Sequence, residues 1–283
     1  MTALDERGTT PPAHRTCGPD AVLAALATVN DPELDQPITE LHFVRSIFID
    51  DSGISVHLRL PTSFCSPNFA YLMASDALDA LEDLDAGTVH VFLDDHHDSD
   101  KINAGLAAHS GYRGTFGVEA ESDLDELRMT FLRKAHTAAM ERAVTPLIRS
   151  GTVTVGDCHH LLLRDLADGP AKYSLLRRRV QIGLGVCPNA RVVVDENGDP
   201  LPAESIPMRL RFARSVRISM EGNGHFCRGL LATRYADDHD CDGISGPVIT
   251  DMRSTTMAVE RTGGHDIPHT GRDIPHTNEE RSA

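Results

Sequence analysis

The sequence predicts an α+β fold, in which a small α-β-β-α-β domain is followed by a mixed, mainly helical second domain and a disordered tail. Apolar residues alternate with polar ones over residues 54–60, which is typical of a half-buried strand. Apolar residues also recur at helical spacing over residues 19–29 and 67–84. Beyond residue 237 the chain turns acidic and then polar, and the pentapeptide Asp-Ile-Pro-His-Thr occurs twice, so we expect no core there.

Proline positions set the limits of the helices in the first domain. Pro19 suits a first helical position, and the residue before Pro32 is pushed out of the α region, so a helix lies between them. Ser66 and Pro67 have the residue types of an N-cap and a first helical residue. The predicted elements are a helix over 19–29, strands over 44–50 and 54–60 joined by a turn, a helix over 67–84 and a strand over 88–93.

A change of composition over residues 94–120 marks the start of a second domain, because this segment is acidic and His-rich and then Gly-rich. The predicted division is a flexible arm over 1–16, a first domain over 17–103, a second domain over 121–236 and a tail over 237–283. In the second domain a capping box at Thr154 and Asp157 predicts a helix start, and Pro146 is expected to kink or end the helix before it. The other predicted elements are helices over 122–149 and 171–184 and strands over 191–195, 208–212 and 216–220.

Composition and charge restrict the class of protein. The net charge of −15 opposes binding to nucleic acid, because phosphate contacts need clustered Lys and Arg. The sequence has neither a secretory signal nor an apolar stretch of membrane-spanning length, so we expect a cytoplasmic protein without a membrane partner. Its six cysteines are then expected to be reduced. They form no CxxC pair, which argues against a zinc ribbon or a thioredoxin motif.

Cys65 is the first candidate for chemistry, because it stands directly before a predicted helix N-cap. The unpaired N–H groups and the dipole at a helix start favour an anion, and the thiolate is the form that binds iron or an iron–sulfur cluster. The alternative is an inert cysteine that packs as a small apolar side chain.

The acidic segment Asp31-Pro32-Glu33, followed by Glu40, is the second candidate. Helix termination and turn geometry explain these residues structurally, and direct contact with a ligand is the alternative. Together with Cys65, the segment resembles the metal–sulfur cluster assembly domain of the PaaD and SufT type, over about residues 17–103.

The chain departs from the pattern of that family at several positions. The family reads Asp-Pro-Glu, then Ile-x-Asp-Leu-Gly-Leu-Val, then Thr-x-x-Cys-Pro. In this chain Glu40 stands in place of the aspartate, His42 in place of the glycine, and Ser66 separates Cys65 from Pro67. Because His42 has a side chain, we expect the backbone there not to take the glycine conformation freely.

The resemblance implies an accessory, chaperone-like protein with no catalytic residues, which delivers iron or an iron–sulfur cluster to a client apo-metalloprotein. It also implies other assembly proteins as partners, a bacterial multicomponent oxygenase as one client, and a homodimer as an alternative to a monomer. Cys65 would be the transient thiolate ligand, and Asp31, Glu33 and Glu40 would shape the site.

Two further groups contain residue types that bind metals. His96 and His97 lie among aspartates after the third strand, and such groups suit iron or zinc. Three other segments contribute Cys158 with His159, Cys187 and Cys227, which would suffice for a zinc or cluster site if they converged. The alternative for this second group is a set of scattered core cysteines and surface histidines.

Two other functions remain open on the sequence alone. One is a metal-dependent or cysteine-based enzyme that acts on a small molecule in a pocket between the domains. The other is a metal-free scaffold that uses the same fold as a binding surface. The sequence contains no P-loop, no dinucleotide fingerprint and no Gly-x-Ser-x-Gly motif, so no particular enzyme class is indicated.

Overall fold

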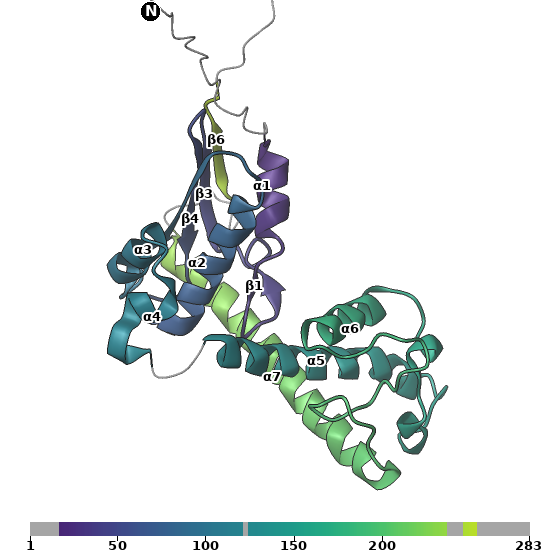
Figure 1. The fold of residues 1–283 in the computed structure, drawn as a ribbon. Helices are drawn as coiled ribbons and strands as arrows, with labels where there is room; N and C mark the ends of the chain where they lie inside the picture. Colours follow the sequence, from purple (N-terminus) through teal and green to yellow (C-terminus); the bar gives the residue numbers. More distant parts are fainter. Residues whose placement is uncertain (1–16, 121–123, 237–245, 254–283) are drawn as a thin grey trace, which may run out of the picture. The chain divides into compact units, whose positions relative to one another are not determined.

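The computed structural model describes residues 17–120, 124–236 and 246–253 (Figure 1). The predicted arm and most of the predicted tail lie outside the described residues, and the predicted domain limits stay a prediction. Among the described helices, none is long and apolar enough to cross a membrane.

The α-helices are α1 (Pro19–Leu26), α2 (Pro67–Glu82), α3 (Ser99–Ala107), α4 (Gly111–Phe116), α5 (Leu124–Arg149), α6 (Pro170–Gln181) and α7 (Ile206–Arg234). The strands are β1 (Asn30–Asp31), β2 (Gln36–Pro37), β3 (Val44–Ile49), β4 (Gly53–Arg59), β5 (Thr88–Asp94) and β6 (Val248–Asp251). The short 3-10 helices are η1 (Gly117–Glu119), η2 (Gly156–His159), η3 (Leu163–Asp165) and η4 (Ala203–Ser205).

The predicted hairpin forms the centre of a sheet whose strand order is β5-β4-β3-β6. Strands β3 and β4 are antiparallel, whereas β5 runs parallel to β4 and β6 runs parallel to β3. Gly53 begins β4 with a φ of 154°, and a Cβ atom there would lie 1.9 Å from the carbonyl oxygen of Thr88. Glycine is therefore required where β4 begins beside β5.

Helices α1 and α2 pack together beside this sheet, and apolar side chains from all three form the first core. Helices α3 and α4 occupy the segment whose composition suggested a domain boundary. Their side chains Ile102, Leu106 and Phe116 are buried in the first core. This segment therefore belongs structurally to the sheet region that precedes it.

A second core lies between α5, α6 and the first half of α7. The predicted long helix agrees with α5, although Pro146 lies inside it and the helix continues to Arg149. The capping box also forms, because the Thr154 hydroxyl accepts the Asp157 amide at 3.3 Å and the Asp157 carboxylate accepts the Thr154 amide at 3.3 Å. Only the short 3-10 turn η2 follows it, where a full helix was predicted.

The predicted strands over 208–212 and 216–220 are wrong, because both segments lie within α7. Apolar and charged residues alternate from residue 208 to residue 212, which imitates a strand over five positions. Over the whole segment the buried positions instead follow a helical stripe, formed by Ile206, Ala213, Met220, Gly224 and Leu231. The predicted strand over 191–195 is reduced to isolated bridges at Arg191 and Val194.

The first core is completed by residues that come late in the chain. Leu231 and Tyr235, from the C-terminal end of α7 and just beyond it, are buried in it. Strand β6 lies in the segment predicted as a tail, and it pairs with β3 from Val248 to Asp251 (Figure 1). The β-branched run in β6 favours a strand.

Candidate functional site

Cys65 lies in the loop between β4 and α2, directly before the N-cap residue Ser66, as the sequence predicted. The Cys65 side chain is partly exposed, and its Sγ lies 3.6 Å from the hydroxyl oxygen of Thr62. The site thus offers an accessible thiol at the start of a helix, where the free N–H groups favour an anion.

The buried imidazole of His96 holds the Cys65 loop in place. Its Nδ1 accepts the backbone N–H of Asp98 at 3.1 Å, so we assign the ring proton to Nε2. Nε2 then donates to the carbonyl oxygen of Cys65 at 2.8 Å. Both ring nitrogens are used in this way, so His96 positions the backbone of Cys65 and presents no free lone pair to a metal in this arrangement.

Arg234 of α7 holds the same loop through its guanidinium group. Its guanidinium donates to the carbonyl oxygen of Leu60 at 3.1 Å and to the Ser63 hydroxyl at 2.8 Å, and it also contacts the carbonyl of Asp95. The hydroxyl of Tyr235 donates to the Asp95 carboxylate at 3.3 Å. The loop that contains Cys65 and the loop after β5 are therefore both fixed to the end of α7.

Asp31 is buried in the turn that follows α1, with 8% of its surface exposed. Its carboxylate accepts the backbone N–H groups of Glu33 at 2.9 Å and of Leu34 at 2.8 Å, which explains the acidic residue at this turn. Burial raises the pKa of Asp31 to about 6 even though these two hydrogen bonds oppose the shift. A carboxyl group that titrates near neutral pH is more than a turn residue requires.

The acidic turn is also held by α7. The side-chain amide of Asn223 donates to the Glu33 carboxylate at 3.2 Å, and the guanidinium of Arg228 donates to the Gln36 side chain at 2.8 Å. These contacts place the intervening residue Cys227 beside the turn.

Cys227 is partly buried against the first core, as Cys65 is. Burial, and after it the nearby charges of Asp31, Cys65 and Glu33, raise the pKa of the Cys227 thiol to about 11. Sequence reasoning grouped Cys227 with Cys158 and Cys187, because it treated the second domain as separate. The structure instead brings Cys227 to the side of the first core that contains Cys65 and Asp31.

The acidic turn and Cys65 lie in one small α/β region, and the sequence of this region is similar to a known family. Residues 19–91 match the family of iron–sulfur cluster assembly proteins. We call residues 19–91 the assembly segment; it runs from α1 into β5 and contains Asp31, Glu33, Glu40 and Cys65. The match supports a general role in iron–sulfur cluster assembly. No curated protein and no solved structure matches the chain.

His42 corrects one expectation about the assembly segment. Its φ is 59°, so the backbone takes the left-handed conformation that glycine would favour. The amide of His42 donates to the carbonyl of Thr39 at 3.2 Å, and the amide of Phe43 donates to the carbonyl of Ile38 at 2.9 Å. These hydrogen bonds hold the turn in spite of the side chain.

Of the remaining predicted ligands, His97 lies beside the Cys65 loop, because its backbone amide donates to the carbonyl of Ser63 at 2.9 Å. Glu40 is exposed before β3, and His97 is exposed with its ring 6.1 Å from that of Phe64. Cys158 is fully buried in the second core, where its thiol lies 3.4 Å from the carbonyl oxygen of Thr154. Cys187 is exposed, and the ring of His159 lies against that of His160. Over the described ranges, no three His, Cys, Asp or Glu residues are grouped so that they could hold a metal ion.

Proposed function

We propose that this protein binds iron or an iron–sulfur cluster transiently and passes it to a client apo-metalloprotein, together with other assembly proteins. The observation that carries the proposal is the position of Cys65, a partly exposed thiol at the start of α2 within the assembly segment. Thiolates are the ordinary protein ligands of iron–sulfur clusters. The cargo is transferred without turnover of a small molecule, and an iron–sulfur protein of an oxygenase is one class of client.

Cys227 supplies the second thiol in this proposal. Its support is the pair of hydrogen bonds from Asn223 and Arg228 to the acidic turn, which hold this face of α7 against the assembly segment. Burial keeps the Cys227 thiol protonated at neutral pH, so binding of the cargo would release a proton from it. The carboxyl group of Asp31 acts electrostatically on Cys227 and would shape the site as a neighbouring charge, since the described residues contain no group of three such side chains placed to hold a metal ion.

Two thiols form an incomplete set of ligands, because iron in clusters is usually held by four donors. This incompleteness suits a carrier, since a client can approach and replace the few protein ligands. Stable resident centres instead have a closed ligand set. The described residues offer no ready-made group of three or more such ligands, which favours a carrier over a resident zinc or iron site.

Anaerobic reconstitution of the full chain with ferrous iron and sulfide tests the proposal. The wild-type protein should gain bound iron and a visible absorption band, and it should transfer the cluster to an apo-ferredoxin. Cys65→Ala should lose most of both, and Cys227→Ala should lose a part of the bound iron. Cys187→Ala is the matched control, because that thiol is exposed and lies outside both cores, and it should behave as wild type.

Two results would contradict the proposal. One is equal iron loading and equal transfer by the wild type and by Cys65→Ala. The other is stoichiometric zinc that is bound in the purified protein and survives both cysteine substitutions, since this would indicate a resident metal elsewhere. Circular dichroism of each variant shows whether a loss of iron reflects a loss of fold.

A further inference from the structure

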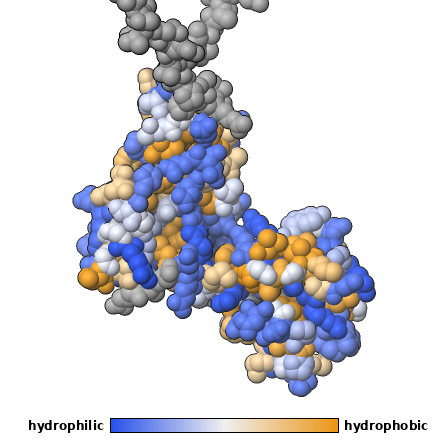
Figure 2. Space-filling view, viewed as in Figure 1, coloured by the Kyte–Doolittle hydropathy of each residue, from blue (hydrophilic) through white to orange (hydrophobic). Residues whose placement is uncertain are grey.

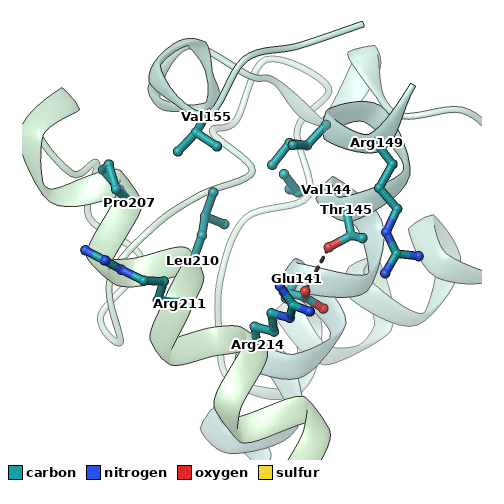
Figure 3. Close-up of a pocket in the computed structure, with 10 residues that line it drawn as sticks. Glu141, Val144, Thr145, Arg149, Val155, Pro207, Leu210, Arg211 and Arg214 are labelled. Atoms are coloured by element: carbon teal, nitrogen blue, oxygen red, sulfur yellow. Dashed lines mark hydrogen bonds between the residues drawn. The ribbon is translucent and has the colours of Figure 1, made fainter. Parts of the chain in front are cut away.

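A pocket of about 400 Å³ lies between α5, α7 and the loop at Val155, next to the second core. Figure 3 shows the aliphatic side chains of Val144, Leu210 and Val155 around this pocket, and Ile148 also lines it. Its volume falls within the range of about 300–1,000 Å³ that is usual for small-molecule sites, and such sites are mainly apolar. Figure 2 shows apolar surface next to hydrophilic residues over the helical region.

Three exposed arginines, Arg149, Arg211 and Arg214, stand at the margins of this pocket (Figure 3). Within the part of the chain that the structure describes, none of the three forms an ion pair or a side-chain hydrogen bond. Nearby arginines behave differently: Arg217 pairs with Glu141 at 2.5 Å, and Arg142 lies 3.6 Å from Glu221. In a chain with a net charge of −15, three guanidinium groups that line one pocket without an acidic partner are unexpected.

Glu141 is the acidic residue in the lining, and its charge is already compensated. It is buried and paired with Arg217, and its other carboxylate oxygen accepts the Thr145 hydroxyl at 2.8 Å. Glu141 therefore does not neutralise the three arginines at the margin. The pocket combines an apolar wall with unsatisfied positive charge.

We propose that this pocket binds a small organic anion, in which an apolar body the size of a medium-length acyl chain or one aromatic ring carries a carboxylate. The aliphatic wall of Val144, Ile148, Val155 and Leu210 would bury the apolar body. The guanidinium groups would pair with the carboxylate, which they do best in a bidentate geometry. This site is separate from the thiols of the proposed cluster function and does not depend on that function.

Isothermal titration of the full chain with octanoate tests the proposal. Octanoate should bind, whereas octanol, which has the body without the charge, and acetate, which has the charge without the body, should bind at least about tenfold more weakly. Octyl phosphate is the arm that distinguishes the head group: weaker binding than octanoate supports the carboxylate, and tighter binding overturns that part of the assignment.

Two variants locate the binding. Arg211→Gln/Arg214→Gln should weaken octanoate at least about tenfold, because charge-assisted hydrogen bonds are lost. The matched control Arg113→Gln/Arg133→Gln removes the same charge from exposed arginines outside this pocket and should leave binding unchanged. Val155→Phe should fill the pocket and block octanoate while all three arginines remain. Each variant should keep wild-type iron loading, which separates this site from the thiol site.

The proposal is wrong if octanol binds as tightly as octanoate, or if the two double variants weaken octanoate equally. It is also wrong if none of the anions binds up to millimolar concentration. Binding of an oligoglutamate peptide that octanoate does not displace would overturn it in favour of a protein partner at this surface.

Discussion

The assembly segment and the helical region around α5 each bury a titratable group, and the two groups are shifted in opposite directions. In the assembly segment, burial raises the pKa of Asp31 to about 6. In α5, burial and then the charges of Arg179 and Arg209 lower the pKa of His136 to about 4. At neutral pH His136 is therefore settled in its neutral form, whereas Asp31 is close to its titration point.

This difference separates a structural group from a functional candidate. The neutral form of His136 avoids burying a charge, although its Nε2 is buried without a hydrogen-bond partner among the described residues. A buried carboxylate that is mostly ionised at pH 7 is unfavourable, and such groups are retained mainly where a site needs them. Asp31 lies near enough to Cys227 to act on the charge of its thiol, so in the proposed function its burial would serve the site.

The largest expected effect tests the ion pair that joins the two regions. Arg178 of α6 is 1% exposed, and its Nε donates to the Asp35 carboxylate at 3.0 Å. Arg178→Ala should lower the free energy of unfolding by about 3–5 kcal/mol, because it leaves the Asp35 charge buried and unpaired. Denaturant unfolding measures this. Its exposed neighbour Arg177 gives the control variant Arg177→Ala. An equal loss of unfolding free energy in both variants would show that the buried ion pair contributes no more to stability than an exposed charge does.

His136→Gln should remove a pH dependence from the helical region. Below pH 6.5 the unfolded chain takes up a proton that folded His136 refuses until about pH 4, so this group makes wild-type stability fall as pH falls through that window. The free energy of unfolding that His136 removes across this pH window is roughly 3 kcal/mol in total. Unfolding curves from pH 7 to pH 4 should therefore be flatter for His136→Gln than for wild type. If the stability of wild type and of His136→Gln changed equally with pH, the titrating group would be a residue other than His136.

Asp31→Asn should remove a pH dependence of stability that has the opposite sign to that of His136. Between about pH 4 and pH 6 the folded protein keeps a proton that the unfolded chain has lost, so this group makes stability fall as pH rises. The variant keeps the acceptor oxygen for the amides of Glu33 and Leu34, and at pH 7 it should be more stable by about 2–3 kcal/mol. Its iron loading should decrease. Greater stability with unchanged loading would separate Asp31 from the site.

The smallest expected effect concerns the contact of Tyr235 with the loop after β5. Its hydroxyl lies 3.3 Å from the Asp95 carboxylate, which is a long hydrogen bond. Tyr235→Phe should lower the free energy of unfolding by less than about 1 kcal/mol and leave iron loading unchanged. Arg234→Ala is the comparison variant, because it removes the contacts to Leu60 and Ser63 and should reduce iron loading. Equal iron loading by both variants would mean that the Cys65 loop keeps its conformation without the contacts of Arg234.

Local patterns predicted the first core well. The alternation over residues 54–60 gave β4, and Ser66 with Pro67 gave the start of α2, because neighbouring residues alone determine these features. The segment from residue 208 to residue 212 misled, since five positions cannot distinguish a strand from a helix with exposed arginines. The spacing of seven from Ile206 through Ala213 to Met220 was the signal that would have revealed α7.

The candidate site was predicted in part. Cys65 was found from its helix start, and the sequence also drew attention to Asp31. The position of Cys227 was missed, because it depends on α7 reaching from the second core to the first. The use of both ring nitrogens of His96 was also missed, since it depends on two loops that meet only in the folded chain.

The late arrival of α7 and β6 has a consequence for biosynthesis. A ribosome releases the assembly segment long before it releases Cys227 and Leu231. The edge of β3 that pairs with β6 stays unpaired for longer still, because β6 is made after α7. During that interval the nascent sheet has an unpaired edge, which favours association with other chains and calls for protection. In the proposed function, the second thiol, Cys227, therefore becomes available only after the whole assembly segment has been made. If both thiols bind the cargo as proposed, a polypeptide that ends before Cys227 would be unable to capture iron through both.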